Sequence, residues 1–150
     1  MLIKKHVGTL FHKMKGERNM EQIIVVLSML FLHIVDDYYL QGWLASAKQK
    51  KWWEQNSPGP LYKNDYIMAL IEHAFSWTFM VHIPIIIYLI IYGFSINKWV
   101  FIATYVANWI IHSVTDDLKA NKMKINLFQD QCIHVLQVLI IYSIYMERMV

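Results

Sequence analysis

The chain has 150 residues, the length of one domain, and its formal net charge is +3. Hydrophobic residues make up 57% of it and charged residues only 17%, against roughly 25% charged residues in soluble domains. Together with a mean hydropathy of +0.32, this composition disfavours a soluble domain and favours an integral membrane protein whose spans carry some polar groups. The single cysteine, Cys132, excludes an internal disulfide and a paired-cysteine zinc site.

Residues 1–19 form a basic arm. No apolar core with a small-residue cleavage site follows it at the spacing of a secretory signal. We expect the arm either to lie on anionic lipid or to be untranslated, with Met20 as the true start. In the second case, a purine-rich run encoding residues 15–18 would act as a ribosome-binding site. The basic residues of the arm are Lys4, Lys5, Lys13, Lys15 and Arg18.

Four largely apolar stretches predict an all-α fold with four transmembrane helices in a single domain, residues 20–150. The clearest stretch contains eighteen residues without a formal charge, from Phe75 to Tyr92. Short connections between the stretches predict an up-down-up-down bundle. Tryptophans beside the first loop are typical of a membrane interface. The predicted spans are residues 22–44, 65–92, 98–118 and 126–147.

Each predicted span contains one histidine at a similar distance from a polar helix end. The distance is seven or eight residues, or roughly 10–12 Å at about 1.5 Å per residue. Because alternate helices of the bundle reverse direction, these four ends lie on the same side. We therefore expect a polar cluster in one half of the bundle, with four imidazoles at one depth: His33, His73, His112 and His134.

Aspartates share helix faces with three of these histidines, because residues four apart lie on one face of a helix. Imidazole and carboxylate groups together suit zinc, manganese or iron. Seven such groups exceed one tetrahedral site, so either two ions are bound or some groups orient the ligands. A hydrogen-bonded polar core without metal is the alternative. The predicted ligands are His33, Asp37, His73, His112, Asp116, Asp130 and His134.

Further polar residues accompany this set. Asp36 and Asp117 each adjoin a predicted ligand, and we expect them to orient ligands, to face water or to act as a catalytic general base. Lys48 and Lys119 lie at the mouth of the same side, as a positive flank or as binding groups for an anionic headgroup. His82 is nine residues from His73, on the opposite face, and is expected to pack. The predicted catalytic residues are Asp36, Asp117 and Lys119.

The polar motifs form an ordered set over about residues 22–140. They are His33-x3-Asp37-Tyr-x-Leu-Gln41 followed by Trp43 and Lys48, then His73, His112-x3-Asp116-x2-Lys119 and Asp130-Gln131-x2-His134. This set resembles a family of small bacterial and phage membrane proteins described as domain of unknown function 3307. The chain departs from the family pattern at Asp36 and Asp117, where a second acid adjoins the motif aspartate. The resemblance implies a bacterial or phage membrane protein and no particular activity.

A looser resemblance, in architecture and polar content, is to inner-membrane metal-dependent hydrolases. Our first functional hypothesis agrees with this resemblance. It is an intramembrane hydrolase that binds one or two divalent ions and acts on a lipid or another anionic amphiphile. The second hypothesis is a metal or proton transporter, although the far half of the predicted bundle is apolar (Ile85–Ile91, Val138–Ile141). The third is a non-catalytic, phage-type membrane protein with a structural metal or polar core. A soluble helical domain with a buried metal site is a further alternative.

The distribution of basic residues bears on orientation in a bacterial inner membrane. Counted over the full chain, the side of the arm and the side of the polar cluster carry seven lysines and arginines each. With Met20 as the start, the arm side keeps only Lys98 and Arg148, and the positive-inside rule places the cluster toward the cytoplasm. The expected partners are membrane lipid and a second copy of the chain, with no nucleic acid.

Overall fold

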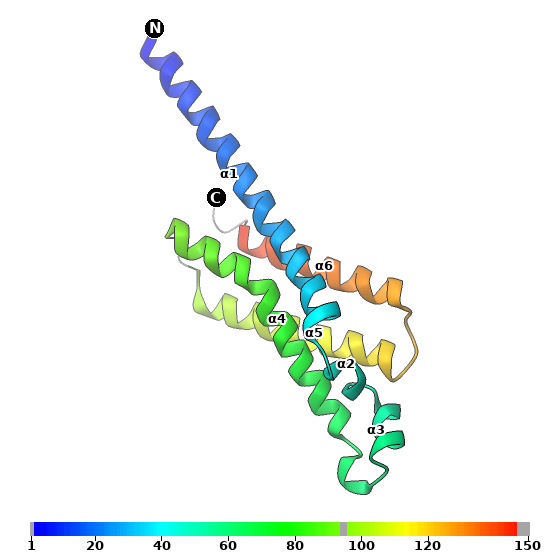
Figure 1. The fold of residues 1–150 in the computed structure, drawn as a ribbon. Coiled ribbons are helices and arrows are strands. Elements are labelled where there is room, and N and C mark those ends of the chain that lie inside the picture. Colours follow the sequence, from blue (N-terminus) through cyan, green and yellow to red (C-terminus); the bar gives the residue numbers. More distant parts are fainter. Residues whose placement is uncertain (1, 94–95, 147–150) are drawn as a thin grey trace.

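The computed structural model describes the backbone of residues 2–93 and 96–146, and the side chains of residues 19–93 and 96–146. Within these residues the regular structure is helical, and no strand occurs. The predicted all-α fold is therefore confirmed. The predicted contact of the basic arm with anionic lipid falls on side chains outside the described part. The helices are α1 (Leu2–Val35), α2 (Leu44–Ala47), α3 (Lys50–Asn56), α4 (Asp65–Tyr92), α5 (Lys98–Ala120) and α6 (Leu127–Met146) (Figure 1).

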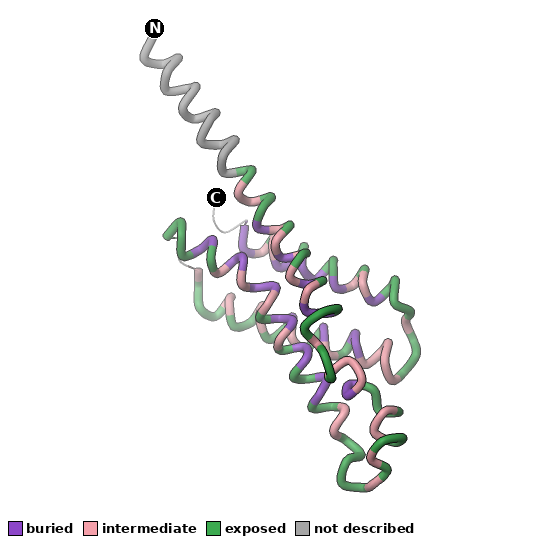
Figure 2. The backbone as a smooth tube through the Cα atoms, viewed as in Figure 1, coloured by how far each residue is buried: buried purple, intermediate pink, exposed green. Residues whose placement is uncertain are grey.

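The four long helices enclose a common interior. Helix α1 contacts α4 and α6, and α5 contacts the same two helices from the other side. Helices α1 and α5 run toward the end of the molecule that carries α2 and α3, whereas α4 and α6 run away from it (Figure 1). Buried residues line the faces that these helices turn toward one another, and exposed residues cover the outside (Figure 2).

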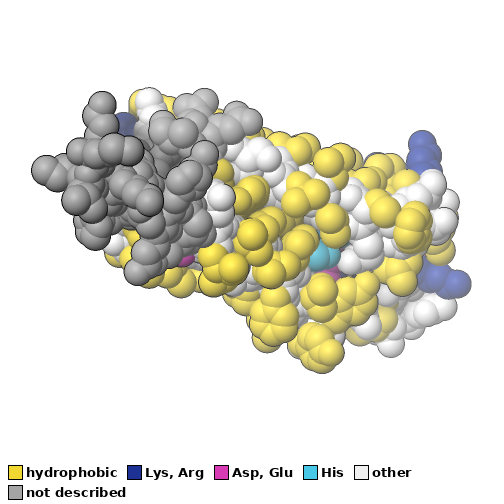
Figure 3. Space-filling model, turned by 90° about the horizontal axis from the view of Figure 1, so that it is seen from above, with side chains coloured by type: hydrophobic (Ala, Val, Ile, Leu, Met, Phe, Trp, Pro, Cys, Tyr) yellow, Lys and Arg dark blue, Asp and Glu magenta, His cyan; other side chains and the backbone are white. Residues whose placement is uncertain are grey.

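Three helical segments of the described chain are long and apolar enough to cross a membrane: Asn19–Leu40, Pro60–Tyr92 and Leu127–Met146. Helix α5 is not among them, because its inner face carries polar residues such as Asn108, His112 and Asp116. Three of the four predicted spans are thus candidate membrane spans by length and composition, and the four-span bundle stays a prediction. The face drawn in Figure 3 is largely apolar, and most of the lysine and arginine side chains visible on it lie at one end, a pattern typical of membrane proteins.

The first predicted span departs from an α-helix in the middle of the polar motif. Helix α1 ends at Val35, and residues Asp36–Leu40 form a π-helical turn. The backbone N–H of Gln41 accordingly donates to the carbonyl of Asp36, five residues earlier, at 3.1 Å. Both Asp36 and Asp37 are buried there. The α-helix of this predicted span therefore ends before residue 44, and the π-helical turn that follows it carries two adjacent buried acids.

Local sequence explains the ends of α4 and α5. Gly93 ends α4 with a φ of +65°, a left-handed conformation that glycine adopts without strain. Asn97 caps α5 by accepting a hydrogen bond from the backbone N–H of Trp99 at 2.9 Å. Pro84 lies within α4 and is buried, where neighbouring helices cover it.

The core of the molecule lies directly beneath the polar cluster. Its members are apolar and come from α1, α4 and α6, with Trp77 as the largest. Tryptophans of the first loop form a second aromatic group, in which Trp43, Trp52 and Trp53 make edge-to-face ring contacts at 5.0–5.9 Å. The fully buried core side chains are Met29, Trp77, Val81, Ile85, Val138 and Tyr145.

Candidate metal centre

The seven predicted ligands all lie inside the molecule, each with at most 6% of its surface exposed. Helix α1 supplies His33, the π-helical turn Asp37, and α4 His73, while α5 and α6 supply two residues each. The structure brings five of the seven into two overlapping groups of potential metal ligands. The first group is Asp37, His73 and His112, and the second is His112, Asp116 and His134.

The first group surrounds the Nε2 atom of His73. This atom lies 3.3 Å from Oδ1 of Asp37, 3.3 Å from Nε2 of His112 and 3.4 Å from Oδ2 of Asp116. Nε2 of His112 lies 4.0 Å from the same two carboxylate oxygens. Ligand atoms bound tetrahedrally at about 2.1 Å from an ion are about 3.4 Å apart. The separations of 3.3–4.0 Å are therefore compatible with a divalent-metal site.

The second group is centred on His134. Its Nε2 atom lies 3.4 Å from Oδ1 of Asp116 and 3.4 Å from Oδ1 of Asp130. Its Nδ1 atom is 3.0 Å from Oε1 of Gln137, and the amide nitrogen of Gln137 donates to Oδ1 of Asn108 at 2.8 Å. Because the amide oxygen can only accept, Nδ1 carries the proton and Nε2 is the atom available to a cation.

Several of the inward-facing atoms have no hydrogen-bond partner within the described part of the protein. They include Oδ1 of Asp37, Oδ1 of Asp130 and Nε2 of His134. A buried acceptor left unpaired is unfavourable by about 1–3 kcal/mol, and more for a charged group. Cations bound beside Asp37 and beside His134 would satisfy these atoms, so the residues present fit metal ions.

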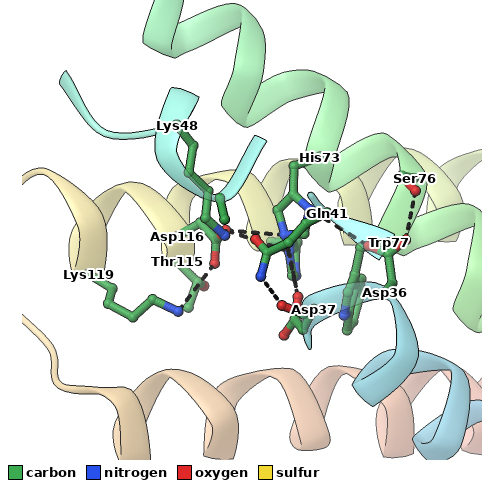
Figure 4. A network of polar contacts seen from close by, with 12 residues as sticks. Asp36, Asp37, Gln41, Lys48, His73, Ser76, Trp77, Thr115, Asp116 and Lys119 are labelled. Atoms are coloured by element: carbon green, nitrogen blue, oxygen red, sulfur yellow. Dashed lines mark hydrogen bonds and ion pairs between the residues drawn. The ribbon is translucent and has the colours of Figure 1, made fainter. Parts of the chain in front are cut away.

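Asp36 lies behind His73. Its Oδ2 atom is 3.7 Å from Nδ1 of His73, and its Oδ1 accepts a hydrogen bond of 2.7 Å from Ser76 (Figure 4). A carboxylate at this position fixes the orientation of the imidazole whose other nitrogen binds the metal. The separation of 3.7 Å is longer than a hydrogen bond, so the orienting role and the general-base role of Asp36 both stay predictions.

His33 is engaged by a tryptophan. The indole N–H of Trp77 donates to Nδ1 of His33 at 2.8 Å, and that nitrogen is also 3.5 Å from Oδ2 of Asp37. The Trp77 ring stacks on His112 at a centroid distance of 4.2 Å. Since its Nδ1 lone pair is used and neither ligand group contains it, the ligand role of His33 stays a prediction.

Two lysines neutralise two of the acids. Nζ of Lys48, a buried residue, lies 2.6 Å from Oδ2 of Asp116 (Figure 4). Nζ of Lys119 lies 2.5 Å from Oδ2 of Asp130. Lys48 follows α2, and the side chain of Asn121 secures this segment to the end of α5. Asn121 accepts from the backbone N–H of Lys50 at 2.7 Å and donates to the carbonyl of Lys48 at 3.1 Å.

Replacing Asn121 with alanine should therefore loosen the Lys48 segment. The two lost hydrogen bonds predict a destabilisation of roughly 1–3 kcal/mol, measured by thermal unfolding in detergent. Gln49→Ala is a suitable control, because the Gln49 side chain donates only to the carbonyl of Ala45 within the same segment. Equal effects of the two substitutions would show that Asn121 does not hold the segment in place.

Asp117, the other predicted catalytic acid, lies apart from both ligand groups. Its Oδ2 atom pairs with Nζ of Lys122 at 2.8 Å, and its Oδ1 accepts from Asn121 at 3.0 Å. The hydrogen bond to Asp117 raises the pKa of Lys122, which is exposed in the loop after α5.

His82 was predicted to pack inside the protein rather than to bind metal. It is fully buried, and its Nδ1 donates to the carbonyl of Thr78 at 2.7 Å.

A cavity of about 410 Å³ reaches Asp37, one member of the first ligand group. Its wall combines Asp37 with the two lysines and with apolar side chains such as Leu127. Gln131, another wall residue, donates to Oδ2 of Asp37 at 3.3 Å and to Oδ2 of Asp130 at 3.1 Å. The wall of the cavity thus combines positive charge, amide groups and apolar surface beside Asp37.

Sequence reasoning did not assign roles to Ser76, Trp77 or Asn121. Ser76 and Trp77 follow His73 by three and four residues, and this spacing indicates a shared helix face. Asn121 could not have been found in this way, because its partners are about seventy residues distant along the chain.

The fold and the cluster define a helical protein with three candidate membrane spans and a buried His/Asp group that could hold a metal ion. Comparisons with protein-family models, curated proteins and solved structures find no match. The resemblance to domain of unknown function 3307 therefore stays a prediction that depends on the motif residues alone.

Proposed function

We propose that the protein is an integral membrane, metal-dependent hydrolase that acts on a lipid or another anionic amphiphile. In this proposal α5 joins the three apolar segments as a fourth span of an up-down-up-down bundle, with its polar face turned to the interior. The membrane is the bacterial inner membrane, and the cluster faces the cytoplasm.

One observation carries the proposal. Ligand atoms close enough to share an ion, several of them without a hydrogen-bond partner in the described residues, include Asp37, which lines a cavity together with two lysines. A purely structural metal site needs no such cavity, because structural sites are closed whereas catalytic sites keep an open position. The apolar part of the wall suits an acyl chain, and the lysines suit an anionic group.

The residues have separate tasks in this mechanism. Asp37, His73 and His112 would hold a divalent ion, whose chemistry is to lower the pKa of bound water and polarise an ester oxygen. Asp36 keeps the His73 ring in place through its Nδ1 atom. Lys119, 26% exposed at its side chain, is placed to orient the anionic group of a substrate.

A transporter requires a polar route through the membrane. On the deep side of the cluster, Trp77 covers His112, and the apolar core continues with Val81 and Ile85. This packing favours an enzyme over a transporter. A non-catalytic membrane protein with a structural metal is the second candidate, supported by the complete burial of the ligands.

The first test is elemental analysis of detergent-purified protein beside the double variant His112→Ala, His134→Ala. We expect zinc, manganese or iron in the wild type and its loss in the variant. His82→Ala is the matched control, because His82 is equally buried but lies outside the cluster. A metal-free wild type, or loss of metal in the control alone, would contradict the proposal.

Catalysis is then tested with the metal-loaded protein and vesicles of anionic or zwitterionic phospholipid. We expect release of hydrolysed product from the anionic vesicles, abolished in the double variant. Bound metal without any release from either vesicle would favour the non-catalytic candidate.

A further inference from the structure

Asp116 occupies a special position between the two ligand groups. Its Oδ2 atom faces Nε2 of His73 at 3.4 Å, whereas its Oδ1 atom faces Nε2 of His134 at the same distance. Asp116 is 1% exposed and lies in α5, near the C-terminal end of that helix. Its two oxygens are thus directed to two different imidazoles rather than to one.

Each of the two oxygens has potential ligand atoms beside it. Beside Oδ2 lie the inward atoms of Asp37, His73 and His112, with separations of 3.3–4.0 Å. Beside Oδ1 lies Nε2 of His134, which is also 3.4 Å from Asp130. His112 belongs to both groups, but a neutral imidazole has one lone pair and can serve only one ion.

We propose that the cluster holds two divalent ions bridged by the Asp116 carboxylate. The first is bound by Asp37, His73 and His112, and the second by Asp130 and His134. This inference rests on the proposed metal-binding function and extends it to the number of ions. In two-metal hydrolytic sites the ions are about 3.5–4 Å apart, a separation that the two oxygens of one carboxylate can span.

The lysines do not compete with this arrangement. Each carboxylate oxygen has two lone pairs, so Oδ2 of Asp116 can accept from Lys48 and still bind an ion. In the same way, Lys119 pairs with Oδ2 of Asp130, whereas Oδ1 of Asp130 faces His134. Oδ1 of Asp130 and Nε2 of His134 have no hydrogen-bond partner in the described residues.

The charge balance indicates the class of substrate. Asp36, Asp37, Asp116 and Asp130 contribute four negative charges and the two lysines two positive charges, which leaves the buried cluster at −2. Two divalent ions change this to +2. Since uncompensated charge is unfavourable in a buried site, a hydroxide and one anionic group would restore neutrality. The substrate is therefore expected to be an anionic ester, such as a phosphodiester lipid.

Manganese titration of purified, metal-stripped protein tests the inference. We expect about two equivalents of Mn²⁺ in the wild type, with the exchange-coupled electron paramagnetic resonance spectrum of two neighbouring ions. His73→Gln and Asp130→Asn should each keep about one equivalent and show an uncoupled spectrum, because each removes a ligand of a different ion. His82→Gln and Asp117→Asn are the matched controls and should keep both ions.

The outcomes separate the two proposals. One equivalent in the wild type, lost in both variants, would overturn the two-ion inference and leave the metal-binding function intact. No bound metal in a folded wild type would overturn the proposed function itself. If His73→Gln fails to fold, judged by circular dichroism and gel filtration, Asp37→Asn replaces it, because Asp37 belongs to the same ion.

Discussion

Replacing Asp116 with alanine is expected to remove most of the bound metal and to destabilise the protein by about 3–5 kcal/mol. This range is the usual loss of stability when one partner of a buried ion pair is removed. Without the Asp116 carboxylate, the buried ammonium group of Lys48 loses its partner at 2.6 Å. Both His73 and His134 lose a neighbouring oxygen as well. Metal content and thermal unfolding in detergent would measure the two effects.

The adjacent acid provides the control for this experiment. Asp117 is one residue further along α5, but it pairs with the largely exposed Lys122 outside the cluster. Exposed ion pairs contribute little to stability, so Asp117→Ala should change neither the metal content nor the unfolding temperature appreciably. If the two substitutions had equal effects, the placement of Asp116 as the inward acid of the pair would be wrong.

Replacing Trp77 with alanine is expected to destabilise the protein by about 3–5 kcal/mol, the usual range for a large aromatic side chain in a core. Trp77 has no exposed surface, and its ring lies against His112 and His134. Its loss should also weaken metal binding, because the His112 ring would no longer be held on one face. Chemical unfolding in detergent and metal titration would measure these changes.

Trp77→Phe separates packing from hydrogen bonding. Phenylalanine keeps much of the aromatic surface but leaves Nδ1 of His33 without its donor, so a smaller loss of roughly 1–3 kcal/mol is expected. A phenylalanine variant as unstable as the alanine variant would indicate that the hydrogen bond to His33, rather than packing, supplies the stability.

The sequence was sufficient to predict some features of this molecule. The uncharged stretch from Phe75 to Tyr92 predicts α4, and its start at Asp65 and end at Tyr92 agree with the structure. The four-residue spacing of His112 and Asp116 predicts a shared face, and both are buried there. These features depend on local periodicity, which the sequence displays directly.

Other features depend on contacts between distant residues. Nothing in the sequence near His33 indicates that its Nδ1 is bound by Trp77, because the two residues meet only when α1 packs on α4. The burial of Lys48 likewise requires Asn121 to hold the loop against α5. Helix α5 was predicted as a fourth span, but it is not among the three candidate segments, because a helix that supplies the centre of a polar site keeps a polar inner face.

The π-helical turn at Asp36–Leu40 determines which side chains face the polar cluster. On an ordinary α-helix, neighbouring side chains point about 100° apart, so two consecutive acids rarely serve one cluster. Here Asp36 and Asp37 are both buried and lie on opposite nitrogens of the same imidazole, His73. A π-helical turn contains one residue more than an α-helical turn. We therefore expect that deleting one residue from the turn would separate the two acids, even if every proposed ligand were retained.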